Sequence, residues 1–303
     1  MLEPTELAWG KRYLMCPPDH FDVSYSINYW MEPSVTVDRD RAYEQWNGLA
    51  RAIRVAGGKV DEVAAQPGLP DMVYTANAGL LDGTTWLPAT MRHPERRGES
   101  GHVNNWFAGG GWDTVAPTTV PQEGAGDALP FRGSLVAGYG PRSELTAYAE
   151  LVERTDWSIV PVLMRDPRFY HVDIAFCPLD EQSAMVVPAA FTGHDRRTLA
   201  RLVPDPVLLE PEEGEMFCAN SVVIGRTVIM PACTPRLGAV LQSRGFDVVV
   251  CDVSEFRKAG GGVRCLTLAL DVELSSPGTG ELRRIPAGDV GDRRRQVEGI
   301  RPS

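Results

Sequence analysis

The chain repeats a pattern in which a short apolar run is followed by a span with helical spacing and then by a second apolar run. The first runs are RYLMCPP (12–18), TWLPAT (85–90), SLVAGYG (134–140), AMVVPAA (184–190) and TVIMPAC (227–233). The spans with apolar residues near i, i+3 and i+4 are 43–57, 144–153, 195–202 and 236–243. The second runs are 59–63, 113–120, 157–163, 206–211 and 247–253. The pattern predicts five successive units that each mix strand and helix.

A connecting stretch leads from each unit to the next, and each stretch holds one easily recognised polar or reactive residue. These residues are Asn77, Glu123, His171, Asn220 and Cys265, at separations of 46, 48, 49 and 45 residues. Equivalent positions in a ring of repeats lie at equivalent places around its axis. We therefore expect these five side chains, remote in sequence, to meet in one pocket.

The last of these stretches, GGGVRCLTLAL (260–270), raises a question about Cys265. A free cysteine usually behaves as a small buried hydrophobic residue, and the run that follows is most simply a core strand. The three glycines before it allow close backbone approach and positive φ angles, so they predict an opening for a substrate beside the thiol. The regular spacing favours a reactive thiol over a core cysteine.

Cys265, His171 and Glu123 supply the three groups of nucleophilic catalysis: a thiol, an acid–base group and a carboxylate that orients it. Asp173 lies two residues after His171, so both side chains point to the same side of an extended segment. Taken alone, His171 is equally compatible with a buried strand histidine bonded to a backbone carbonyl. Glu123 and Asp127, in EGAGD, are equally compatible with a surface turn.

Metal binding is the competing functional interpretation, because His, Glu, Asp and Cys are all metal ligands. No histidine pair occurs at i, i+4 spacing, and the six cysteines form no C-x-x-C pair. The other four histidines lie at non-equivalent positions of the units. We therefore expect neither a metal ion nor a disulfide framework.

Composition narrows the class of partner. The 303 residues carry a net charge of −10, which argues against a general affinity for nucleic acid or anionic lipid. No window approaches 18 uninterrupted apolar residues, and residues 1–16 lack the pattern of a secretory signal. We expect a cytoplasmic protein that binds a small molecule, with no nucleic-acid and no membrane partner.

The C-terminal segment differs in composition from the rest of the chain. It is rich in glycine, proline and charged residues and has few large apolar side chains. Such a segment buries too little apolar surface to order itself. We expect one catalytic domain over residues 1–272 and a flexible tail over residues 273–303.

Five motifs in one order carry a resemblance to a known group of enzymes. They are LMCPPDHFDVSYSIN, YTANAG, EGAGD, YHVDIAF and GGGVRCLTLAL. In this order they resemble the guanidine-modifying pentein superfamily, which includes dimethylarginine dimethylaminohydrolases, arginine deiminases, amidinotransferases and arginine dihydrolases. The resemblance covers nearly all of residues 12–272. It implies an α/β fold, a five-bladed α/β propeller with pseudo-fivefold repeats, in agreement with the repeat described above.

The resemblance also implies roles for individual residues. Cys265 would attack the guanidinium carbon, His171 would protonate the leaving amine and then activate water, and Glu123 would hold His171. Asp173 would grip the guanidinium nitrogens, and two arginines would bind the substrate carboxylate. The full set of substrate-binding positions is Asn28, Asn77, Arg92, Asp127, Arg142, Asp173 and Asn220. No cofactor is implied.

Asn77 favours the arginine dihydrolases within the superfamily. Deiminases and dimethylarginine hydrolases usually carry an aspartate there, whereas dihydrolases resemble this chain in having TAN. A neutral amide both donates and accepts hydrogen bonds, so it tolerates a ureido group as well as a guanidinium. We expect hydrolysis of one or both terminal C–N bonds of arginine or a close analogue, giving citrulline, or ornithine with carbon dioxide and ammonia.

Other activities stay open at this point. The chain reads INYWM and YTANAG where those relatives commonly read INPWM and FTANAG, so Tyr29 and Tyr74 leave the substrate unsettled. A dimethylarginine hydrolase and an amidinotransferase are alternatives within the same chemistry. A guanidino-binding protein without turnover is the alternative outside it. A homo-oligomer is compatible with the sequence.

Overall fold

A computed structural model describes residues 6–274 of the chain. Its strands are β1 (Arg12–Met15), β2 (Lys59–Glu62), β3 (Gly79–Asp82), β4 (Thr85–Pro88), β5 (Asp113–Thr114), β6 (Ala128–Phe131), β7 (Ser134–Tyr139), β8 (Ser158–Leu163), β9 (Phe176–Pro178), β10 (Ser183–Val186), β11 (Asp205–Leu208), β12 (Val222–Ile224), β13 (Thr227–Met230), β14 (Asp247–Val250) and β15 (Leu268–Ala269). Its α-helices are α1 (Arg39–Val55), α2 (Glu99–Gly109), α3 (Gly124–Asp127), α4 (Leu145–Arg154), α5 (Gly193–Leu202), α6 (Pro211–Glu215), α7 (Pro235–Ser243) and α8 (Ser254–Arg257). Five short 3-10 helices are η1 (Pro70–Val73), η2 (Thr75–Ala78), η3 (Pro94–Arg96), η4 (Val172–Ile174) and η5 (Pro188–Ala190).

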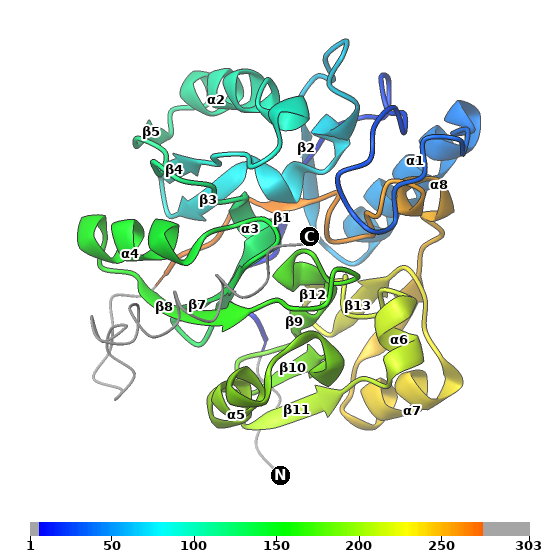
Figure 1. The fold of residues 1–303 in the computed structure, drawn as a ribbon. Coiled ribbons are helices and arrows are strands. Elements are labelled where there is room, and N and C mark those ends of the chain that lie inside the picture. Colours follow the sequence, from blue (N-terminus) through cyan, green and yellow to red (C-terminus); the bar gives the residue numbers. More distant parts are fainter. Residues whose placement is uncertain (1–5, 275–303) are drawn as a thin grey trace, which may run out of the picture.

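The strands of residues 6–274 form five three-stranded sheets with one shared topology. The sheets are β15-β1-β2, β3-β4-β5, β6-β7-β8, β9-β10-β11 and β12-β13-β14. In each sheet the middle strand pairs antiparallel with the first strand and parallel with the third. A parallel pair needs a long crossover, and here an α-helix supplies it every time: α1, α2, α4, α5 and α7. Figure 1 shows these helices at the outside of the molecule and the sheets nearer its centre.

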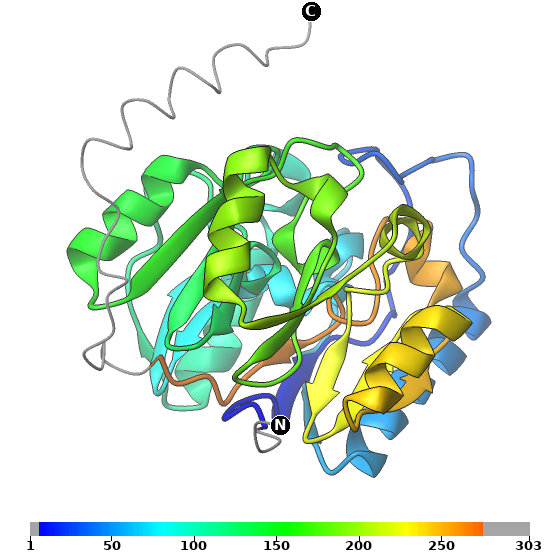
Figure 2. The ribbon, with the colours of Figure 1, turned by 90° about the horizontal axis from the view of Figure 1, so that it is seen from below.

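The first sheet joins the two ends of the described chain. Tyr13 in β1 pairs with Ala269 in β15, and Leu14 pairs with Leu268. Figure 2 shows the blue β1 and the orange segment around β15 side by side below the centre of the molecule. The segment that carries Cys265 is therefore held against the N-terminal unit.

The helix α1 shows why the crossover helices form and why they lie outside. Its buried residues are Ala42, Gln45, Trp46, Leu49, Ala50 and Ile53, a stripe along one face, while the opposite face is exposed. The side chain of Asp38 caps its first turn by accepting a hydrogen bond from the backbone of Arg41 at 3.1 Å. Burial of the apolar stripe against the sheet holds the helix in place.

Most predicted elements are confirmed, with two exceptions. The predicted strand runs and helical spans each contain an observed strand or helix, although the run 113–120 contributes only Asp113–Thr114. The helix α2 has no counterpart in the prediction, because its glycines and polar residues weaken the apolar periodicity. The strands β3, β6, β9 and β12 also have no separate counterpart in the prediction, because a buried run of three or four residues has no diagnostic period. The core strand predicted after Cys265 is confirmed by β15.

The structure is a mixed α/β fold, as predicted, and five sheets of one topology fit a pseudo-fivefold arrangement. None of the helices in residues 6–274 combines the length and the apolar character needed to span a bilayer. The predicted C-terminal tail lies outside the described residues from position 275 onward.

Core packing on α1 gives a first prediction. Leu49 is fully buried on the inner face of α1, so Leu49→Ala leaves a cavity and is expected to lower the free energy of unfolding by about 2–5 kcal/mol. The matched control is Val55→Ala, because Val55 ends the same helix with 82% of its surface exposed. Its expected change is within about 0.5 kcal/mol. Urea denaturation measures both variants, and equal losses would contradict this packing.

Candidate active site

The five residues singled out by their spacing occupy equivalent places in the fold. Each lies in or beside the turn that leads into the first strand of a sheet: Asn77 before β3, Glu123 before β6, His171 before β9, Asn220 before β12 and Cys265 before β15. All five side chains are buried, with 3% exposure or less. The structure brings their connections together, as contacts between successive pairs show.

Asn77, Glu123 and His171 form one half of the site. Asn77 Nδ2 donates to the backbone carbonyl of Glu123 at 3.3 Å and lies 3.4 Å from His171 Nδ1. The other ring nitrogen, His171 Nε2, lies 2.8 Å from Glu123 Oε2. Gly126 permits this approach, because a Cβ there would lie 2.1 Å from Asn77 Nδ2. The EGAGD motif thus serves as a packing surface for Asn77, not as a surface turn.

Asn220, Asp173 and Cys265 form the other half. Asn220 Nδ2 donates to the backbone carbonyl of Asp173 at 3.2 Å and to Cys265 Sγ at 3.1 Å. The thiol lies 3.5 Å from Asp173 Oδ2. The backbone carbonyl of Cys265 accepts a hydrogen bond from Ala76, beside Asn77, at 3.2 Å. This last contact closes a ring of contacts through all five connections.

The glycines before Cys265 lie close to protein side chains. A Cβ on Gly261 would lie 2.0 Å from the ring of Tyr74, and one on Gly262 would lie 2.5 Å from Asn220 Oδ1. Gly260 has φ +84° and faces the Asn28 side chain in the same way. The predicted close approach and the positive φ are confirmed, and the groups that approach are protein side chains. Access of a substrate beside these glycines stays a prediction.

Glu123 is a buried carboxylate held in its ionised form. Burial by itself would raise its pKa, but Arg142 and His171 outweigh that effect and hold the pKa well below its usual range. Arg142 Nη1 donates to Glu123 Oε2 at 2.8 Å, and the backbone of Arg92 donates to Oε1 at 3.0 Å. Burial lowers the pKa of His171 to about 4 despite its bond to Glu123. The pair therefore consists of a carboxylate and a neutral imidazole.

The thiol of Cys265 is protonated in the free protein. Burial, and next the negative charge of Asp173, raise its pKa well above the usual range. Burial also raises the pKa of Asp173 to about 7, and the buried cation of Arg264 is the main opposing influence. A cation placed beside both groups would favour the thiolate and the carboxylate together.

Asp127 and Asn220 hold protein groups in this structure. Asp127 accepts hydrogen bonds from the Ser143 hydroxyl at 2.7 Å and from the backbone of Val172, next to His171, at 3.2 Å. Asn220 Oδ1 accepts from the backbone of Arg264 at 2.9 Å and of Cys265 at 3.3 Å. Both side chains thus position a neighbouring connection, and their role in substrate binding stays a prediction.

The predicted carboxylate-binding arginines and Asn28 lie at the border of the site. Arg142 is buried against Glu123, and the half-buried guanidinium of Arg92 contacts the Arg142 carbonyl at 2.8 Å and Glu144 at 3.3 Å. Asn28 Nδ2 donates to the carbonyl of Ala259 at 3.0 Å, which ties residues 17–31 to the glycine segment. Arg142 thus contacts Glu123 and Asn28 contacts the glycine segment, and their role in substrate binding stays a prediction.

Three buried charged residues of the site were missed by sequence reasoning: Asp71, Arg96 and Glu99. Arg96 Nη1 donates to Asn77 Oδ1 at 2.8 Å, and Glu99 binds the same guanidinium with both carboxylate oxygens at 2.9 and 2.8 Å. Asp71 Oδ1 is buried and accepts no hydrogen bond from the described residues. The i, i+3 spacing of Arg96 and Glu99 was the available signal, but Arg92 in the same RHPERRGE segment was chosen instead.

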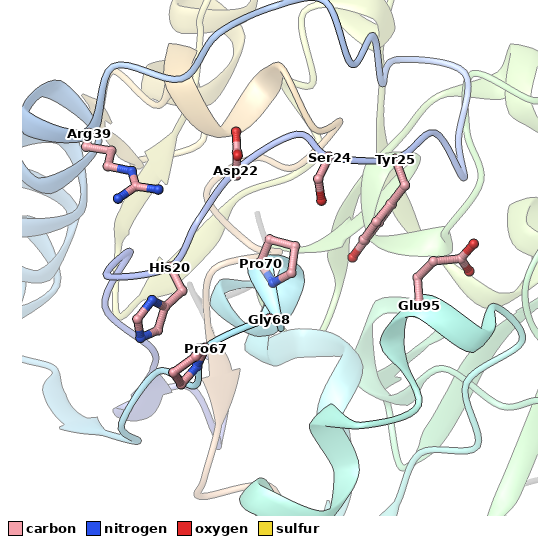
Figure 3. Close-up of a pocket in the computed structure, with 9 residues that line it drawn as sticks. All are labelled: His20, Asp22, Ser24, Tyr25, Arg39, Pro67, Gly68, Pro70 and Glu95. Carbon is pink, nitrogen blue, oxygen red and sulfur yellow. The ribbon is translucent and has the colours of Figure 1, made fainter.

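A solvent-facing hollow of about 460 Å³ adjoins this part of the site. Figure 3 shows Tyr25 and Glu95 on one side of it and His20 and Arg39 on the other. Tyr25 belongs to the segment that Asn28 ties down, and both burial and the nearby carboxylate of Asp71 raise its pKa. The hollow therefore borders the side of the site on which Asp71 lies.

A buried thiol joined through a ring of contacts to a histidine–carboxylate pair is an arrangement of enzymes that use nucleophilic catalysis. Within residues 6–274 the acidic, histidine and cysteine side chains form no group of three or more arranged to hold a metal ion. Comparison with known proteins narrows this class. The model of the family described as "N,N dimethylarginine dimethylhydrolase, eukaryotic" matches residues 20–272. The chain belongs to this family.

Individual relatives point the same way. The bifunctional arginine dihydrolase/ornithine cyclodeaminase AgrE of Nostoc sp. is 41% identical over 263 residues, which cover 85% of this chain and 37% of AgrE. The chain thus spans little more than a third of that relative's length. The N(G),N(G)-dimethylarginine dimethylaminohydrolase of Mycobacterium tuberculosis is 37% identical, with 86% of each chain covered.

A solved structure supports the fold. The N-terminal domain of ArgZ, an arginine dihydrolase from the ornithine–ammonia cycle in cyanobacteria, was crystallised as a mutant bound to its substrate. It superposes with a TM-score of 0.84 at 38% identity, covering 87% of this chain and 99% of that domain. The resemblance inferred from the motifs is confirmed.

The environment of Cys265 gives a second prediction. Because the charge of Asp173 raises the pKa of Cys265, Asp173→Asn should lower that pKa and speed iodoacetamide labelling of Cys265 at pH 8 by about tenfold, the effect of one pKa unit. Mass spectrometry of the Cys265 peptide separates this thiol from the other five. Asp180→Asn is the control, because Asp180 is a buried carboxylate paired with Arg226 away from the thiol. Labelling that is no faster in Asp173→Asn would exclude this coupling.

Proposed function

We propose that this chain is a cysteine-dependent hydrolase that cleaves C–N bonds in the guanidino group of arginine or a close analogue. One observation carries the proposal: the Cys265 thiol lies 3.5 Å from a buried aspartate and is linked through the same connection to the His171–Glu123 pair. The family membership and the arginine dihydrolase and dimethylarginine hydrolase relatives support it.

The acceptors of the site suit a guanidinium. Asp173 Oδ1 and Asp71 Oδ1 are both buried without a hydrogen-bond donor among the described residues. A guanidinium carries a positive charge and only donors, in a planar fork that matches carboxylates. A guanidinium bound at Asp173 would satisfy its free oxygen and place a cation beside the thiol.

The bound substrate would then activate its own nucleophile. In the free protein, burial and the charge of Asp173 keep Cys265 protonated. A guanidinium between the two groups favours the thiolate, because opposite charges lower the pKa of a thiol. The free protein is therefore expected to be poorly reactive, and the thiolate forms where the substrate carbon lies.

The chemical steps follow from these groups. The Cys265 thiolate attacks the guanidinium carbon, and the proton lost by the thiol passes through His171 to the departing nitrogen as the C–N bond breaks. Ammonia leaves and a covalent thiouronium-type adduct remains. Water then gives a proton to His171 as its oxygen attacks the same carbon. As the C–S bond breaks, the hydroxyl proton on that carbon passes to the departing sulfur and restores the thiol, and His171 releases its proton to the departed ammonia or to solvent. Glu123 keeps His171 oriented throughout.

Asn77 supports a second hydrolysis. Its amide carries no charge, so it does not require a cationic ligand beside it, and the site tolerates the neutral ureido group of citrulline. Repetition of the two steps on the ureido carbon would release a second ammonia and leave a carbamate on the side-chain nitrogen. The carbamate then loses carbon dioxide as its C–N bond breaks, and the nitrogen takes the carbamic proton to give ornithine. This is the arginine dihydrolase activity, with a dimethylarginine hydrolase as the second candidate because of the family match.

The finer structural predictions are proposed with the function. We propose that the five sheets are the blades of a five-bladed α/β propeller and that residues 1–272 form one catalytic domain. A small guanidino molecule is the proposed ligand, with Arg92 and Arg142 near its carboxylate. The cytoplasmic location and a homo-oligomer stay predictions.

Incubation of the pure protein with arginine tests the function. We expect citrulline, ornithine and ammonia as products, and no turnover by Cys265→Ser, because the hydroxyl is a weaker nucleophile than the thiolate. Parallel incubations with methylated arginines, and with arginine plus glycine, detect a dimethylarginine hydrolase or an amidinotransferase. Absence of product from all of these would refute the proposal, whereas ligand binding without any turnover would favour the non-catalytic alternative.

The ratio of products tests Asn77. In Asn77→Asp a carboxylate replaces the neutral amide and favours the cationic guanidinium over the neutral ureido group. Citrulline should therefore accumulate, and the ornithine-to-citrulline ratio should fall about tenfold, the effect of about 1.4 kcal/mol. Chromatography of both products measures the ratio. Asn104→Asp is the control, because Asn104 uses only its carbonyl oxygen, as acceptor for Trp86. An unchanged ratio in Asn77→Asp would rule out this role.

A further inference from the structure

We infer that Arg96 and Glu99 are positioning residues that act with Glu123 to hold the proton of His171 on Nε2, because they fix the direction in which the Asn77 amide faces Nδ1. The importance of this arrangement for catalysis rests on the proposed function. The arrangement itself is inferred from the hydrogen-bond donors and acceptors along one buried row of side chains.

The line begins at the Arg96 guanidinium, which has donors and no acceptor. Arg96 Nη1 lies 2.8 Å from one end of the Asn77 amide. That end must be the carbonyl oxygen, because the amide nitrogen would place hydrogens against hydrogens. Arg96 and Asn77 are both about 3% exposed, so water cannot easily take the place of either partner.

The amide nitrogen of Asn77 must then face the opposite way. There it meets the backbone carbonyl of Glu123 at 3.3 Å and His171 Nδ1 at 3.4 Å. The carbonyl can only accept, which agrees with the orientation that Arg96 imposes. Since the amide nitrogen only donates, His171 Nδ1 must present its lone pair, and the ring proton must sit on Nε2.

The far end of the line is consistent with this tautomer. His171 Nε2 lies 2.8 Å from Glu123 Oε2, which Arg142 keeps ionised, so an Nε2–H donates to a carboxylate. Nε2 is thus committed to Glu123, and Nδ1 is the nitrogen left to exchange a proton with a substrate. The orientation of one amide therefore leaves this nitrogen ready to act as a base.

Glu99 keeps the guanidinium in the required plane. Its two oxygens bind Arg96 Nε at 2.9 Å and Nη2 at 2.8 Å, a bidentate pair that fixes the fork and leaves Nη1 aimed at Asn77. Arg96 Nη2 also donates to the backbone carbonyl of Asp71 at 3.2 Å. Glu99 comes from the first turn of α2 and Arg96 from the end of η3, so the clamp joins two elements across the edge of the site.

Turning the Asn77 amide over would favour a proton on Nδ1 of His171 instead of a lone pair. Asn77 Oδ1 would then face Nδ1 and stabilise a proton there, so the population of the Nδ1–H form or of the imidazolium would rise. The charged groups that face the imidazole are Glu123 and Asp127, the latter 4.0 Å from Nε2, with Arg142 and Arg96 further out. None of these other groups contacts Nδ1 in the way that the amide does.

A pair of variants at Arg96 separates the donor from the shape of the side chain. Arg96→Lys keeps a cationic donor for Asn77 Oδ1, whereas Arg96→Met keeps the length and removes the donor. Ring 15N NMR of the substrate-free protein, assigned with a His171→Asn sample, reports which nitrogen carries the proton. We expect the Nε2–H form in the wild type and in Arg96→Lys, and a several-fold rise of Nδ1–H in Arg96→Met. The same tautomer in all three would overturn the inference.

Glu99→Gln carries the same test should Arg96→Met fail to fold. This substitution weakens the Glu99–Arg96 pair without removing the Arg96 donor, so we expect a partial rise of the Nδ1–H form. We also expect kcat to fall roughly tenfold or more and KM to change less, because acid–base catalysis is impaired more than binding. Glu213→Gln is the matched control, since Glu213 is a buried glutamate paired with Arg236 outside the site. An unchanged tautomer in Glu99→Gln overturns the inference as well.

A failure of this inference can be told apart from a failure of the proposed function. The NMR measurement uses the free protein and needs no turnover. A wild-type protein that turns over no guanidino compound, yet shows the Nε2–H form that Arg96→Met loses, would refute the function and leave the amide arrangement standing. A merely structural role for Arg96 would lower the stability of both Arg96 variants and shift the tautomer in neither.

Discussion

The burial of one negative charge organises this protein. Glu123 is completely enclosed, and an ionised carboxylate in such a place is stable only with charged or hydrogen-bonding partners. Arg142 supplies the charge, the backbone of Arg92 supplies a further donor, and His171 supplies the third contact as a neutral ring. These partners come from different turns of the fold, so the position of His171 depends on all of those turns being in place.

The repeat explains how so many turns reach one place. Each of the five connections runs through a short turn into the first strand of a sheet, and that strand pairs antiparallel with its neighbour. The polar residue at each turn consequently arrives at an equivalent position. Hydrogen bonds between backbone and side chain then link neighbouring connections, from the Asn77 amide to the Glu123 carbonyl and from the Cys265 backbone N–H to Asn220 Oδ1. The site is therefore as rigid as the packing of the repeat units, which are joined at their ends by β1 and β15.

The electrostatic states that result are those of a resting enzyme awaiting a cation. Cys265 is a thiol, His171 is neutral, and Asp173 has a pKa of about 7. Each of these states follows first from burial, which disfavours charge. Glu123 opposes the effect of burial on His171 and Arg264 opposes it on Asp173, whereas the charge of Asp173 reinforces it on Cys265. The proposed guanidinium ligand would alter the balance for the thiol and the aspartate at once. Under the proposed function, substrate binding and the activation of the nucleophile are two aspects of the same electrostatic change.

The sequence by itself indicated the α/β repeat, the order of the units and the three groups Cys265, His171 and Glu123. Apolar periodicity and equal spacing are visible in the sequence without any coordinates. The sequence did not reveal α2, whose apolar periodicity is weak, or the strands β3, β6, β9 and β12, which are too short to show a period. Only the tertiary structure decided the partners of the charged residues. Arg96 rather than Arg92 contacts Asn77, and the glycines before Cys265 admit Tyr74 and Asn220. A pair of side chains becomes a hydrogen-bond pair only where the fold brings the two within about 3 Å of each other. No spacing along the sequence encodes that distance.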